Sequence, residues 1–550
     1  MYQSLNKMIE SSFRKNWERE ALSNFHGITL RYKDVATSIA KLHIIFDKCG
    51  LKKGDKIAIC SRNQANWGVI FLAATTYGAV AVPLLHEFKP GNIHFLVNHS
   101  EARILFVGSY MWDDLNQHEM PDLEAIIAIE NFELLYSATE QISSERAALD
   151  ETFAKQFPEG LKPEDINYHE DTADELALIN YTSGTSGFSK GVMLPYRSLT
   201  SNVLFALEAE PHMNNSSKVV SMLPTAHMYG LMFEFLFEMT VGAHVYFLTR
   251  LPSPKVILEA LGEVKPDIII SVPLIIEKIY KNTLMPIISK NSIKLLLNLP
   301  IIDQVIKNKI LKNLTDAFGC SFEEVIIGGA ALNKEAEAFF RKIRFPFTVG
   351  YGMTECGPII TYAHWDKTCL YSCGKAAPRM ELKIDSPDPA NIAGEVLVKG
   401  DNVFLGYYKN EEATAASFTE DGWFRTGDMG VLDNDGFLYL RGRNKSMILG
   451  PSGQNIYPEE IEGIINNLPY VTESLVIEDN GQLTALIYPD FDTANKSGMS
   501  DEDLHASLQE SVNLANIELP NYCKIAKFEV FPEEFEKTPK KSIKRYLYQR

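Results

Sequence analysis

Short aliphatic runs alternate with segments of helical periodicity along most of the chain. Examples of the runs are KIAIC at residues 56–60, ARILFV at 102–107 and DIIISVP at 267–273. Strands that are buried on both faces read as continuous apolar runs, and helices usually connect parallel neighbours. The alternation therefore predicts an α/β fold whose strands are largely buried.

The longest apolar run, WGVIFLAATTYGAVAVPLL at residues 67–85, approaches the length of a membrane span. Gly78 and Pro83 interrupt its second half, so we expect a buried helix that leads into a buried strand. The N-terminal segment MYQSLNKMIESSFRKNWERE lacks an apolar core followed by a small-residue cleavage site, and it is typical of an amphipathic helix. Both features favour a cytoplasmic protein.

The pattern changes near residue 430. GFLYLRGR, preceded by DNDG, predicts one arm of a hairpin, and YPEEIEGIINN opens a helix with Pro458 in its first turn. Residues 471–490 predict a second hairpin with the turn DNG. We therefore predict a large, multi-layer N-terminal domain with α/β subdomains at residues 1–442 and a small α+β C-terminal domain at 443–550.

Composition narrows the range of functions. A net charge of -18 argues against nucleic acid as a partner, because such binding needs many Lys and Arg contacts to phosphate. The seven cysteines have no repeated spacing, which suits a reducing compartment better than a disulfide scaffold. We therefore expect no nucleic-acid partner and a reducing compartment.

A polar, glycine-rich segment, YTSGTSGFSKG at residues 181–191, follows the apolar run ELALIN. Leu199 and Val203 behind it repeat at helical spacing, so we expect a loop that connects a strand to a helix. The lysine does not directly follow the second glycine, which excludes a P-loop. The hydroxyls and the flexible backbone amides nevertheless suit an anion such as phosphate.

Three further segments carry groups that a nucleotide site needs. YGMTE at residues 351–355 combines an aromatic ring, a hydroxyl and a carboxylate, which suit a base, a phosphate and a hard cation. FRTGD at 424–428 places Asp428 in a predicted tight turn, where a carboxylate suits ribose hydroxyls. IIGGAAL at 326–332 predicts a strand that ends in two glycines.

Together and in this order, these segments resemble the adenylate-forming superfamily of acyl-CoA synthetases, aryl-CoA ligases, luciferases and peptide-synthetase adenylation domains. The polar loop is similar to the signature YTSGTTGxPKG, with Ser186 for threonine and Phe188 and Ser189 for the x-Pro pair. LPTAHMYG at 223–230 and GRNKSMILGPSGQNIYPEEIE at 442–462 match further blocks. The resemblance covers nearly the whole chain.

The resemblance implies a reaction in two steps. ATP and a carboxylic acid form an acyl-adenylate and pyrophosphate, and the thiol of coenzyme A then attacks the adenylate and releases AMP. It also implies Mg²⁺ at Glu355, with Thr354 at the α-phosphate. The residues implied at the β- and γ-phosphates are Thr182, Ser183, Gly184, Thr185, Ser186, Gly187 and Lys190.

The resemblance also implies residues that contact the nucleoside, the acid and the thiol. Those implied around the adenine are Tyr351, Gly352, Gly329 and Ala330. Those implied elsewhere are Asp428 and Arg443 at the ribose, His227 at the acyl pocket, Lys445 at a hinge between the domains, and Gly453 along the path of the pantetheine arm.

One departure from the family pattern lies near the C-terminal end. The family normally reads TPTGKIKR, with a lysine that adenylation needs, whereas this chain reads TPKKSIKR and has Ser542 at that position. We predict that Lys541 supplies the ammonium group from the neighbouring position, because its stem is flexible. A protein specialised for thioester formation, and a nucleotide- or lipid-responsive binding protein on a decayed ligase fold, stay open as alternatives.

The region between the acyl pocket and the two glycines indicates the acid. VPLIIEKIY at 272–280 and the lysine-rich stretch at 279–318 resemble long-chain fatty acyl-CoA synthetases. We expect helices packed on the large domain there, with a lipid-facing patch or a partner surface as alternatives.

That resemblance implies a medium-to-long-chain fatty acid as the substrate. An apolar tunnel needs no charged specificity residue, and none stands out in this sequence. Peripheral contact with the inner face of a membrane fits such a substrate. An acyl-AMP ligase and an acyl-carrier-protein synthetase are the alternatives, with an acyl carrier protein as their partner.

Overall fold

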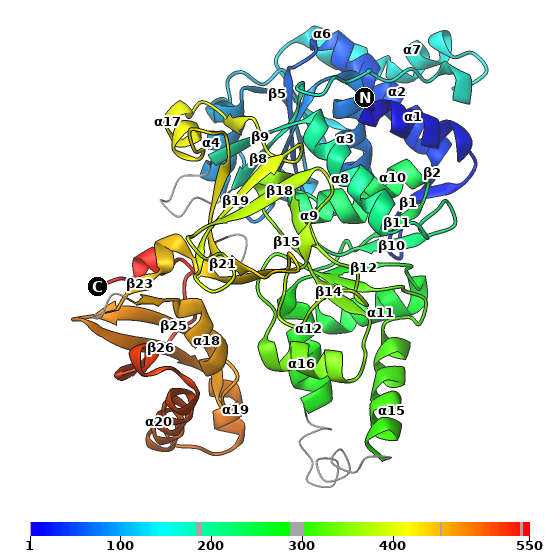
Figure 1. The fold of residues 1–550 in the computed structure, drawn as a ribbon. Coiled ribbons are helices and arrows are strands. Elements are labelled where there is room, and N and C mark those ends of the chain that lie inside the picture. Colours follow the sequence, from blue (N-terminus) through cyan, green and yellow to red (C-terminus); the bar gives the residue numbers. More distant parts are fainter. Residues whose placement is uncertain (1, 183–189, 286–301, 451–453, 539–542) are drawn as a thin grey trace. The chain divides into compact units, whose positions relative to one another are not determined.

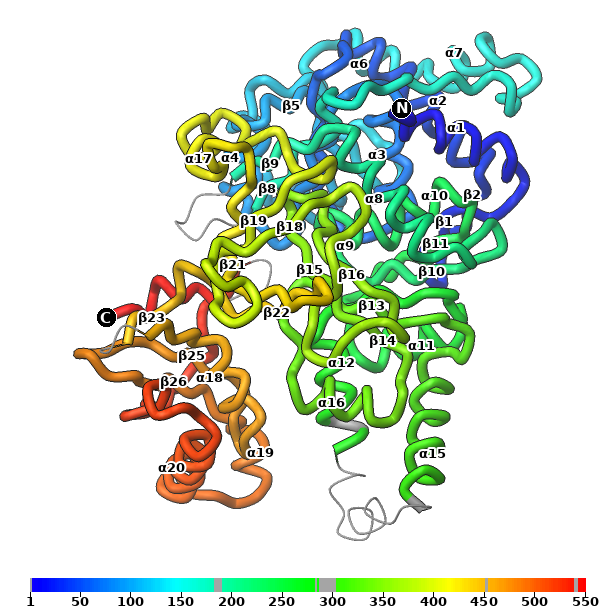
Figure 2. The backbone as a smooth tube through the Cα atoms, in the orientation of Figure 1, coloured from blue at the N-terminus to red at the C-terminus, as the bar shows by residue number. Residues whose placement is uncertain are grey.

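The computed structural model describes residues 2–182, 190–285, 302–450, 454–538 and 543–550. Contacts divide the chain into two compact units (Figure 1, Figure 2). Within those ranges, the first unit comprises residues 2–182, 190–381 and 399–416, and the second comprises 382–398 and 417–550. Each unit has its own buried hydrophobic clusters.

Among the described residues, the largest sheet of the first unit has eight strands, in the order β20-β9-β8-β4-β3-β5-β6-β7. Neighbours from β8 through β4, β3 and β5 to β6 run parallel, and β7, β9 and β20 are antiparallel to their neighbours. The apolar strands β3, β4 and β5 are almost entirely buried, which confirms the predicted α/β character. The eight strands are β3 (Lys56–Cys60), β4 (Val80–Leu84), β5 (Ala102–Val107), β6 (Ala125–Ala128), β7 (Leu134–Ser137), β8 (Leu176–Thr182), β9 (Lys190–Pro195) and β20 (Gly406–Tyr407).

The apolar run at 67–85 is a helix followed by a strand, as predicted. Helix α3 (Ala65–Tyr77) is buried from its first residue to Thr76, and it leads into β4. Gly78 ends the helix at φ 87°, a conformation that glycine adopts without strain. In the part of the chain that the structure describes, no helix has the length and apolarity needed to cross a membrane.

Three smaller sheets also belong to the described part of the first unit, in the orders β10-β11-β1-β2, β12-β13-β14 and β15-β16-β17. Strand β13 ends directly before Gly328 and Gly329, which confirms the predicted strand with two terminal glycines. The strands are β1 (Glu20–Asn24), β2 (Thr29–Arg31), β10 (Lys218–Ser221), β11 (His244–Phe247), β12 (Ile269–Ser271), β13 (Val325–Ile327), β14 (Phe347–Val349), β15 (Tyr351–Gly352), β16 (Ile359–Tyr362) and β17 (Lys375–Ala376).

Helices connect these strands, and α1 (Leu5–Lys15) confirms the predicted N-terminal helix. The other α-helices of the first unit in the described ranges are α2 (Tyr32–Lys48), α4 (Pro90–Ser100), α5 (Ser109–Trp112), α6 (Glu140–Ala147), α7 (Leu149–Gln156), α8 (Tyr196–Ala209), α9 (Met228–Leu231), α10 (Phe237–Val241), α11 (Pro254–Val264), α12 (Pro273–Ile279), α15 (Ile302–Ala317), α16 (Lys334–Lys342) and α17 (Glu411–Ala416).

The described parts of the stretch 279–318 are helical and packed, as predicted. Helix α15 contributes Ile310 and Leu314 to a buried cluster that also contains Phe318 and Phe345. This packing explains the apolar positions of the stretch. The segment 286–301, on which the lipid-facing and partner-surface alternatives also depend, lies outside the described residues.

The polar loop does not connect a strand to a helix, so that prediction is wrong. Residues 190–195 form β9, which pairs antiparallel with β8 before the chain enters α8. The sequence GVMLP from Gly191 to Pro195 is apolar and mostly buried, and β9 completes its hydrogen bonds on β8 and β20. The loop therefore lies between two strands of the large sheet.

The second unit contains two predicted hairpins and the helix that begins at Pro458, and all three are confirmed. Asp428 lies within strand β21 and not in a tight turn, which corrects the prediction; it lies opposite Arg443 of β22 in the ladder. The elements that lie wholly or mostly in the described part of the second unit are β18 (Met380–Asp385), β19 (Gly394–Gly400), β21 (Phe424–Leu432), β22 (Leu438–Arg443), β23 (Ile448–Leu449), β24 (Asn455–Ile456), β25 (Val471–Asp479), β26 (Gln482–Pro489), β27 (Lys527–Val530), α18 (Pro458–Ile465), α19 (Phe491–Lys496) and α20 (Asp501–Glu518).

Candidate functional site

The ends of β8 and β9 frame the polar loop. Thr182, the last residue of β8, lies opposite Lys190, the first residue of β9, and its hydroxyl donates to the Lys190 carbonyl at 3.5 Å. Both side chains are partly buried. The predicted phosphate-binding residues Ser183, Gly184, Thr185, Ser186 and Gly187 lie outside the described residues.

Three segments that are far apart in the sequence meet at Glu355. The ammonium group of Lys190 lies 4.5 Å from the ring centroid of Tyr407, a cation–π distance. The hydroxyl of the same tyrosine donates to Oε1 of Glu355 at 2.9 Å. Tyr407 therefore links the lysine of the polar loop to the predicted metal-binding carboxylate.

Sequence reasoning missed Tyr407. It lies in the short edge strand β20, within the aromatic segment FLGYYKN. Pairing of β20 with β9 places this tyrosine near Lys190. The two adjacent tyrosines were the available signal, but nothing in the sequence indicates that β20 pairs with β9.

The turn that carries Thr354 and Glu355 is held in place by buried hydrogen bonds. The fully buried side chain of Asn202 on α8 donates to the Cys356 carbonyl at 3.2 Å and accepts from the Ile359 amide at 3.0 Å. The backbone amide of the residue at position 404 donates to the Glu355 carbonyl at 2.9 Å. Thr354 and Glu355 are 6% and 8% exposed, so both side chains are positioned on a rigid support.

A cavity in the first unit is adjacent to this turn. Five of the residues predicted for the site line it, and they come from three separate segments of the chain. These residues are His227, Gly329, Tyr351, Gly352 and Thr354. The structure thus places these segments, which are far apart in the sequence, in the wall of one cavity.

His227 lies at the N-terminus of the short helix α9. Its Nδ1 accepts a hydrogen bond from the Tyr229 amide at 3.3 Å. The preceding residue, Ala226, is tied to β8 because the amide side chain of Asn180 donates to its carbonyl at 2.9 Å. These bonds orient the imidazole along the cavity wall.

The two glycines after β13 differ in their environment. A Cβ atom on Gly328 would lie 3.1 Å from the ring of Tyr229, so the close approach of that ring favours glycine. Gly329 has φ 88° and lines the cavity, whereas the predicted adenine residue Ala330 is exposed and is not among the lining residues.

The rest of the cavity wall is mainly apolar, but it includes one carboxyl group. Phe205, Phe233 and Ile270 contribute to the apolar part, and Glu210 lines the same cavity. Glu210 is 3% exposed, and burial together with the neighbouring Glu324 raises its pKa to about 9. The cavity wall therefore includes a buried carboxyl group that did not stand out in the sequence.

In the second unit, Asp428 and Arg443 form an ion pair. Arg443 Nε lies 2.8 Å from Asp428 Oδ1, and the aspartate side chain is 9% exposed while the arginine is 56% exposed. The Asp428 amide donates to the Thr426 hydroxyl at 3.1 Å, which orients the strand at this point. The predicted hinge residue Lys445 is exposed. Gly453 and Lys541 lie outside the described residues.

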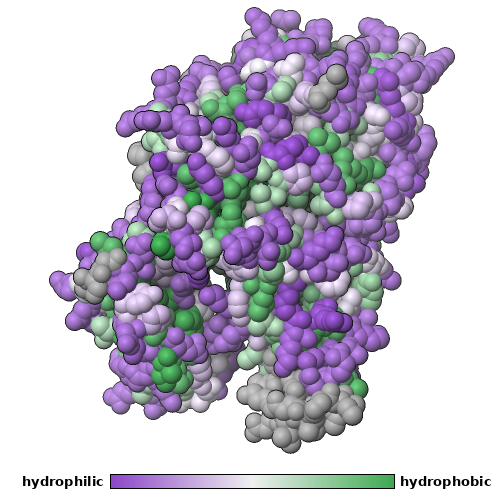
Figure 3. All heavy atoms as spheres, in the orientation of Figure 1, coloured by the Kyte–Doolittle hydropathy of each residue, from purple (hydrophilic) through white to green (hydrophobic). Residues whose placement is uncertain are grey.

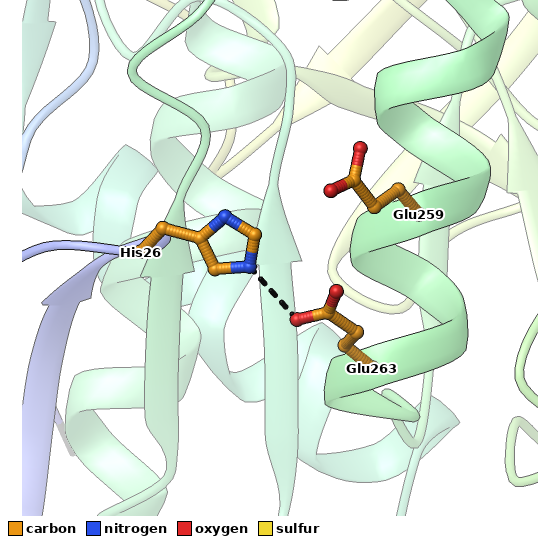
Figure 4. Close-up of side chains that lie close together, drawn as sticks. All are labelled: His26, Glu259 and Glu263. Atoms are coloured by element: carbon orange, nitrogen blue, oxygen red, sulfur yellow. Dashed lines mark hydrogen bonds and ion pairs between the residues drawn. The ribbon is translucent and has the colours of Figure 1, made fainter.

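A separate group of potential metal ligands lies on the surface (Figure 4). His26, Glu259 and Glu263 place one ligand atom each within 4.8 Å of one another, and all three are exposed. His26 Nε2 lies 2.8 Å from Glu263 Oε2. Exposed pairs of this kind contribute little to stability, and we assign no metal to the group.

Comparison with known proteins gives two profile matches. The profile of AMP-binding enzymes matches residues 9–408, and the profile of the AMP-binding enzyme C-terminal domain matches residues 445–550. The long-chain-fatty-acid–CoA ligase FadD15 of Mycobacterium bovis is 27% identical over 546 residues, covering 90% of this chain and 86% of that protein. The luciferin 4-monooxygenase of Photuris pensylvanica is 28% identical over 471 residues, covering 82% and 78%.

Solved structures with a similar fold cover nearly the whole chain. ATP-bound MatB from Rhodopseudomonas palustris aligns with a TM-score of 0.76 at 21% identity, over 99% of this chain and 98% of that one. The anthranilate CoA ligase AuaEII in complex with anthranoyl-AMP aligns with a TM-score of 0.78 at 19% identity, over 100% and 96%. The fold is thus a mixed α/β architecture with a large N-terminal domain and a separate C-terminal domain.

Proposed function

Since the chain belongs to the family of AMP-binding enzymes, we propose that it activates a medium-to-long-chain fatty acid as an acyl-adenylate and transfers the acyl group to coenzyme A. The first step consumes ATP and releases pyrophosphate, and the second releases AMP. Relatives named long-chain-fatty-acid–CoA ligases, at 27% identity, support this class of acid and this acceptor.

The observation that carries the proposal is the meeting of Lys190, Tyr407 and Glu355 beside the cavity. In adenylation, a substrate carboxylate must approach the α-phosphate although both are anions. A lysine at the phosphates and a cation on Glu355 would offset that repulsion. The apolar cavity beside Thr354 would hold the acid so that its carboxylate faces the nucleotide.

The residues around Glu355 fit Mg²⁺. This ion takes oxygen ligands and usually keeps several waters, binding through one or two carboxylates and the substrate phosphates. Glu355 offers a carboxylate that is 8% exposed and oriented by Tyr407, and Thr354 is its neighbour. When bound, the ion would neutralise phosphate charge, while Glu355 holds it and Thr354 contacts the α-phosphate.

The remaining nucleotide contacts are proposals from the same resemblance. Tyr351 and Gly329 would enclose the adenine from the cavity wall, and Asp428 with Arg443 would bind the ribose hydroxyls. The ion pair at 2.8 Å supports the second role, because it holds the aspartate in one orientation before ATP binds. The polar loop from Thr182 to Lys190 would hold pyrophosphate and then release it.

The domain boundary and the hinge are also proposals. We place the domains at 1–442 and 443–550, with Lys445 at the hinge and Gly453 along the path of the pantetheine arm. The C-terminal profile match, which begins at residue 445, supports this division. Rotation at the hinge would exchange the catalytic face of the small domain between the two steps.

Lys541 is the proposed adenylation lysine, since Ser542 replaces the family lysine. Lys541→Ala should slow ATP–pyrophosphate exchange selectively and leave the reaction of added acyl-AMP with coenzyme A unchanged. Lys540→Ala is the matched control, because it removes a neighbouring positive charge. If only the second step suffers in the Lys541 variant, this assignment is wrong.

The alternative acceptors differ in the molecule that takes up the acyl group. An acyl-AMP ligase or an acyl-carrier-protein synthetase would share the adenylation site, but would pass the acyl group to a carrier protein.

Cytoplasmic location and peripheral membrane contact are proposals too. Hydrophilic residues cover most of the face seen in Figure 3, with smaller hydrophobic groups between them.

The deciding experiment is ATP–pyrophosphate exchange with acids from acetate to oleate and with several aromatic acids. Exchange with the longer acids, together with consumption of coenzyme A and release of AMP, is the expected result. Exchange without consumption of coenzyme A would favour the carrier-protein alternatives. Binding of ATP without exchange for any acid would favour a binding protein on a ligase fold, with Ser542 as the reason.

A further inference from the structure

We propose that Glu210 determines which acid is accepted: with Tyr362 it forms a polar end of the acyl cavity that accepts a hydrogen bond from a hydroxyl or amino group at the distal end of the substrate. This inference rests on the proposed function and deepens it, since it names a subclass of acid. Glu210 is a residue of the binding pocket and takes no part in the adenylation chemistry.

Glu210 is placed by the end of a helix. It directly follows α8, and its amide donates to the Ala206 carbonyl at 2.9 Å. Phe205 and Ala209 of the last helical turns line the cavity beside it. Among the described lining residues Glu210 is the only one with a carboxyl group. Its carboxyl group is therefore a distinct polar site in a cavity wall that is otherwise mainly apolar.

Tyr362, at the end of β16, connects Glu210 to a second buried carboxyl group. Its hydroxyl lies 2.9 Å from Glu210 Oε1 and also contacts Glu324 Oε1. A phenol has one proton, so it donates to one of these carboxyl groups and must accept from the other. The arrangement therefore requires a proton on one of the two carboxyl groups.

The surroundings indicate which carboxyl group carries that proton. Glu324 is fully buried, its Oε2 accepts from the Trp365 amide at 2.9 Å, and His364 Nε2 lies 3.9 Å away. Burial raises the pKa of Glu324 as well, but the Tyr362 hydroxyl, the Trp365 amide and His364 oppose that rise and favour the ionised form. Glu210 has fewer donors near it, and its raised pKa, about 9, agrees with a protonated carboxyl.

One oxygen of Glu210 accepts no hydrogen bond from the described residues. Oε2 is buried and has no hydrogen-bond partner among the described residues, and the nearest ion-pair neighbour, His212 Nδ1, is 3.6 Å away. A buried polar oxygen without a donor is destabilising. A ligand that brings a donor to this oxygen therefore gains a hydrogen bond that a plain methyl end cannot make.

The test compares acids that differ only at the distal end. Each plain saturated acid is paired with the ω-hydroxy and ω-amino acid of equal length, from about six to sixteen carbons. Binding to the full chain is measured by titration calorimetry, and ATP–pyrophosphate exchange is measured in parallel. At the length that reaches Glu210, the polar-ended acid should bind roughly tenfold to a hundredfold more tightly, with the gain in KM and not in kcat.

Variants locate the effect. Glu210→Leu should abolish the preference and improve binding of the plain acid, while Glu210→Gln, which keeps a carbonyl acceptor and the volume, should retain part of it. Tyr362→Phe should weaken the preference, because Tyr362 positions Glu210. Glu238→Gln is the matched control: Glu238 is also a buried carboxyl group with a raised pKa, but it does not line the cavity.

Two outcomes separate this inference from the proposed function. Equal binding of the paired acids at every length, unchanged in Glu210→Leu, would overturn the inference even in a fully active enzyme. A protein that shows no exchange with any acid would contradict the proposed function, and the calorimetric preference and its loss in Glu210→Leu would still decide the role of Glu210.

Discussion

Two sets of polar side chains in and beside the cavity of the first unit present different kinds of chemistry. In the first set, Lys190, Thr354 and Glu355 belong to sequence blocks that the resemblance had already singled out, and Tyr407 joins Lys190 to Glu355. The second set is Glu210 in the cavity wall, which belongs to no motif. In the proposed function the first set, the nucleotide end, would bind the phosphates that the shared reaction needs, whereas Glu210, the acyl end, would meet the part of the acid that varies.

This difference shows where sequence motifs stop being informative. A shared chemical step constrains residue types and spacing, so the nucleotide end is recognisable from the sequence. The acyl end is constrained by shape and by burial, and a glutamate in ALEAEP looks like an ordinary solvent-exposed residue until the fold buries it. Variants of Glu355 and Tyr407 test the nucleotide end, and variants of Asp428 and Glu238 provide a comparison outside the cavity.

The largest effect is expected from Glu355→Gln at the nucleotide end. Glutamine preserves the volume and can still accept from Tyr407, but it removes the charge that would hold Mg²⁺. ATP–pyrophosphate exchange should fall on the order of 10²- to 10³-fold, with the thermal midpoint of unfolding nearly unchanged. An unaltered exchange rate at saturating Mg²⁺ would contradict the metal-binding role.

Asp428→Asn should have the next largest effect, although this residue belongs to the second unit. Hydrogen bonds to a charged acceptor are worth about 1.5–3 kcal/mol, so the Kd for ATP should rise roughly tenfold to a hundredfold. Titration calorimetry with ATP measures it. Asp433→Asn, at an aspartate in the turn between β21 and β22, is the control, and equal effects of both variants would argue against a ribose contact.

Tyr407→Phe should have a smaller effect, because it keeps the ring near Lys190 and removes only the hydroxyl that reaches Glu355. Loss of one neutral donor to a carboxylate predicts a decrease in exchange of about tenfold. Tyr407→Leu also removes the cation–π contact, so it should be several-fold worse than Tyr407→Phe. If the two variants are equally active, the ring has no role in positioning Lys190.

The smallest effect concerns stability and uses Glu238, a buried carboxyl group that does not line the cavity. Burial raises its pKa from 4.5 to about 8. The folded protein therefore keeps a proton that the unfolded chain releases, so this group lowers the free energy of unfolding as pH rises from about 4.5 towards 8. Between about pH 4.5 and about pH 8, the free energy of unfolding should fall less in the Glu238→Gln variant than in the wild type. Calorimetric unfolding at these two pH values measures the difference. A parallel loss in both proteins would contradict the raised pKa.

Much of the fold follows from local sequence. The continuous apolar runs gave correct strands, and Gly78 correctly marked the end of a helix within the run at 67–85. The errors share a cause. β9 and the strand position of Asp428 depend on pairing with strands that are distant in sequence or separated by a turn, and local pattern does not encode which edge a strand will find.

The family, the order of the polar blocks and the residue types at the nucleotide end could all be read from the amino-acid sequence, because a shared reaction requires particular groups in a fixed order. The folded chain was needed to find that Tyr407 joins Lys190 to Glu355, and that Glu210, Tyr362 and Glu324 share one buried site. Both arrangements depend on contacts between segments that are distant in the sequence, and on burial that changes the protonation of a carboxyl group.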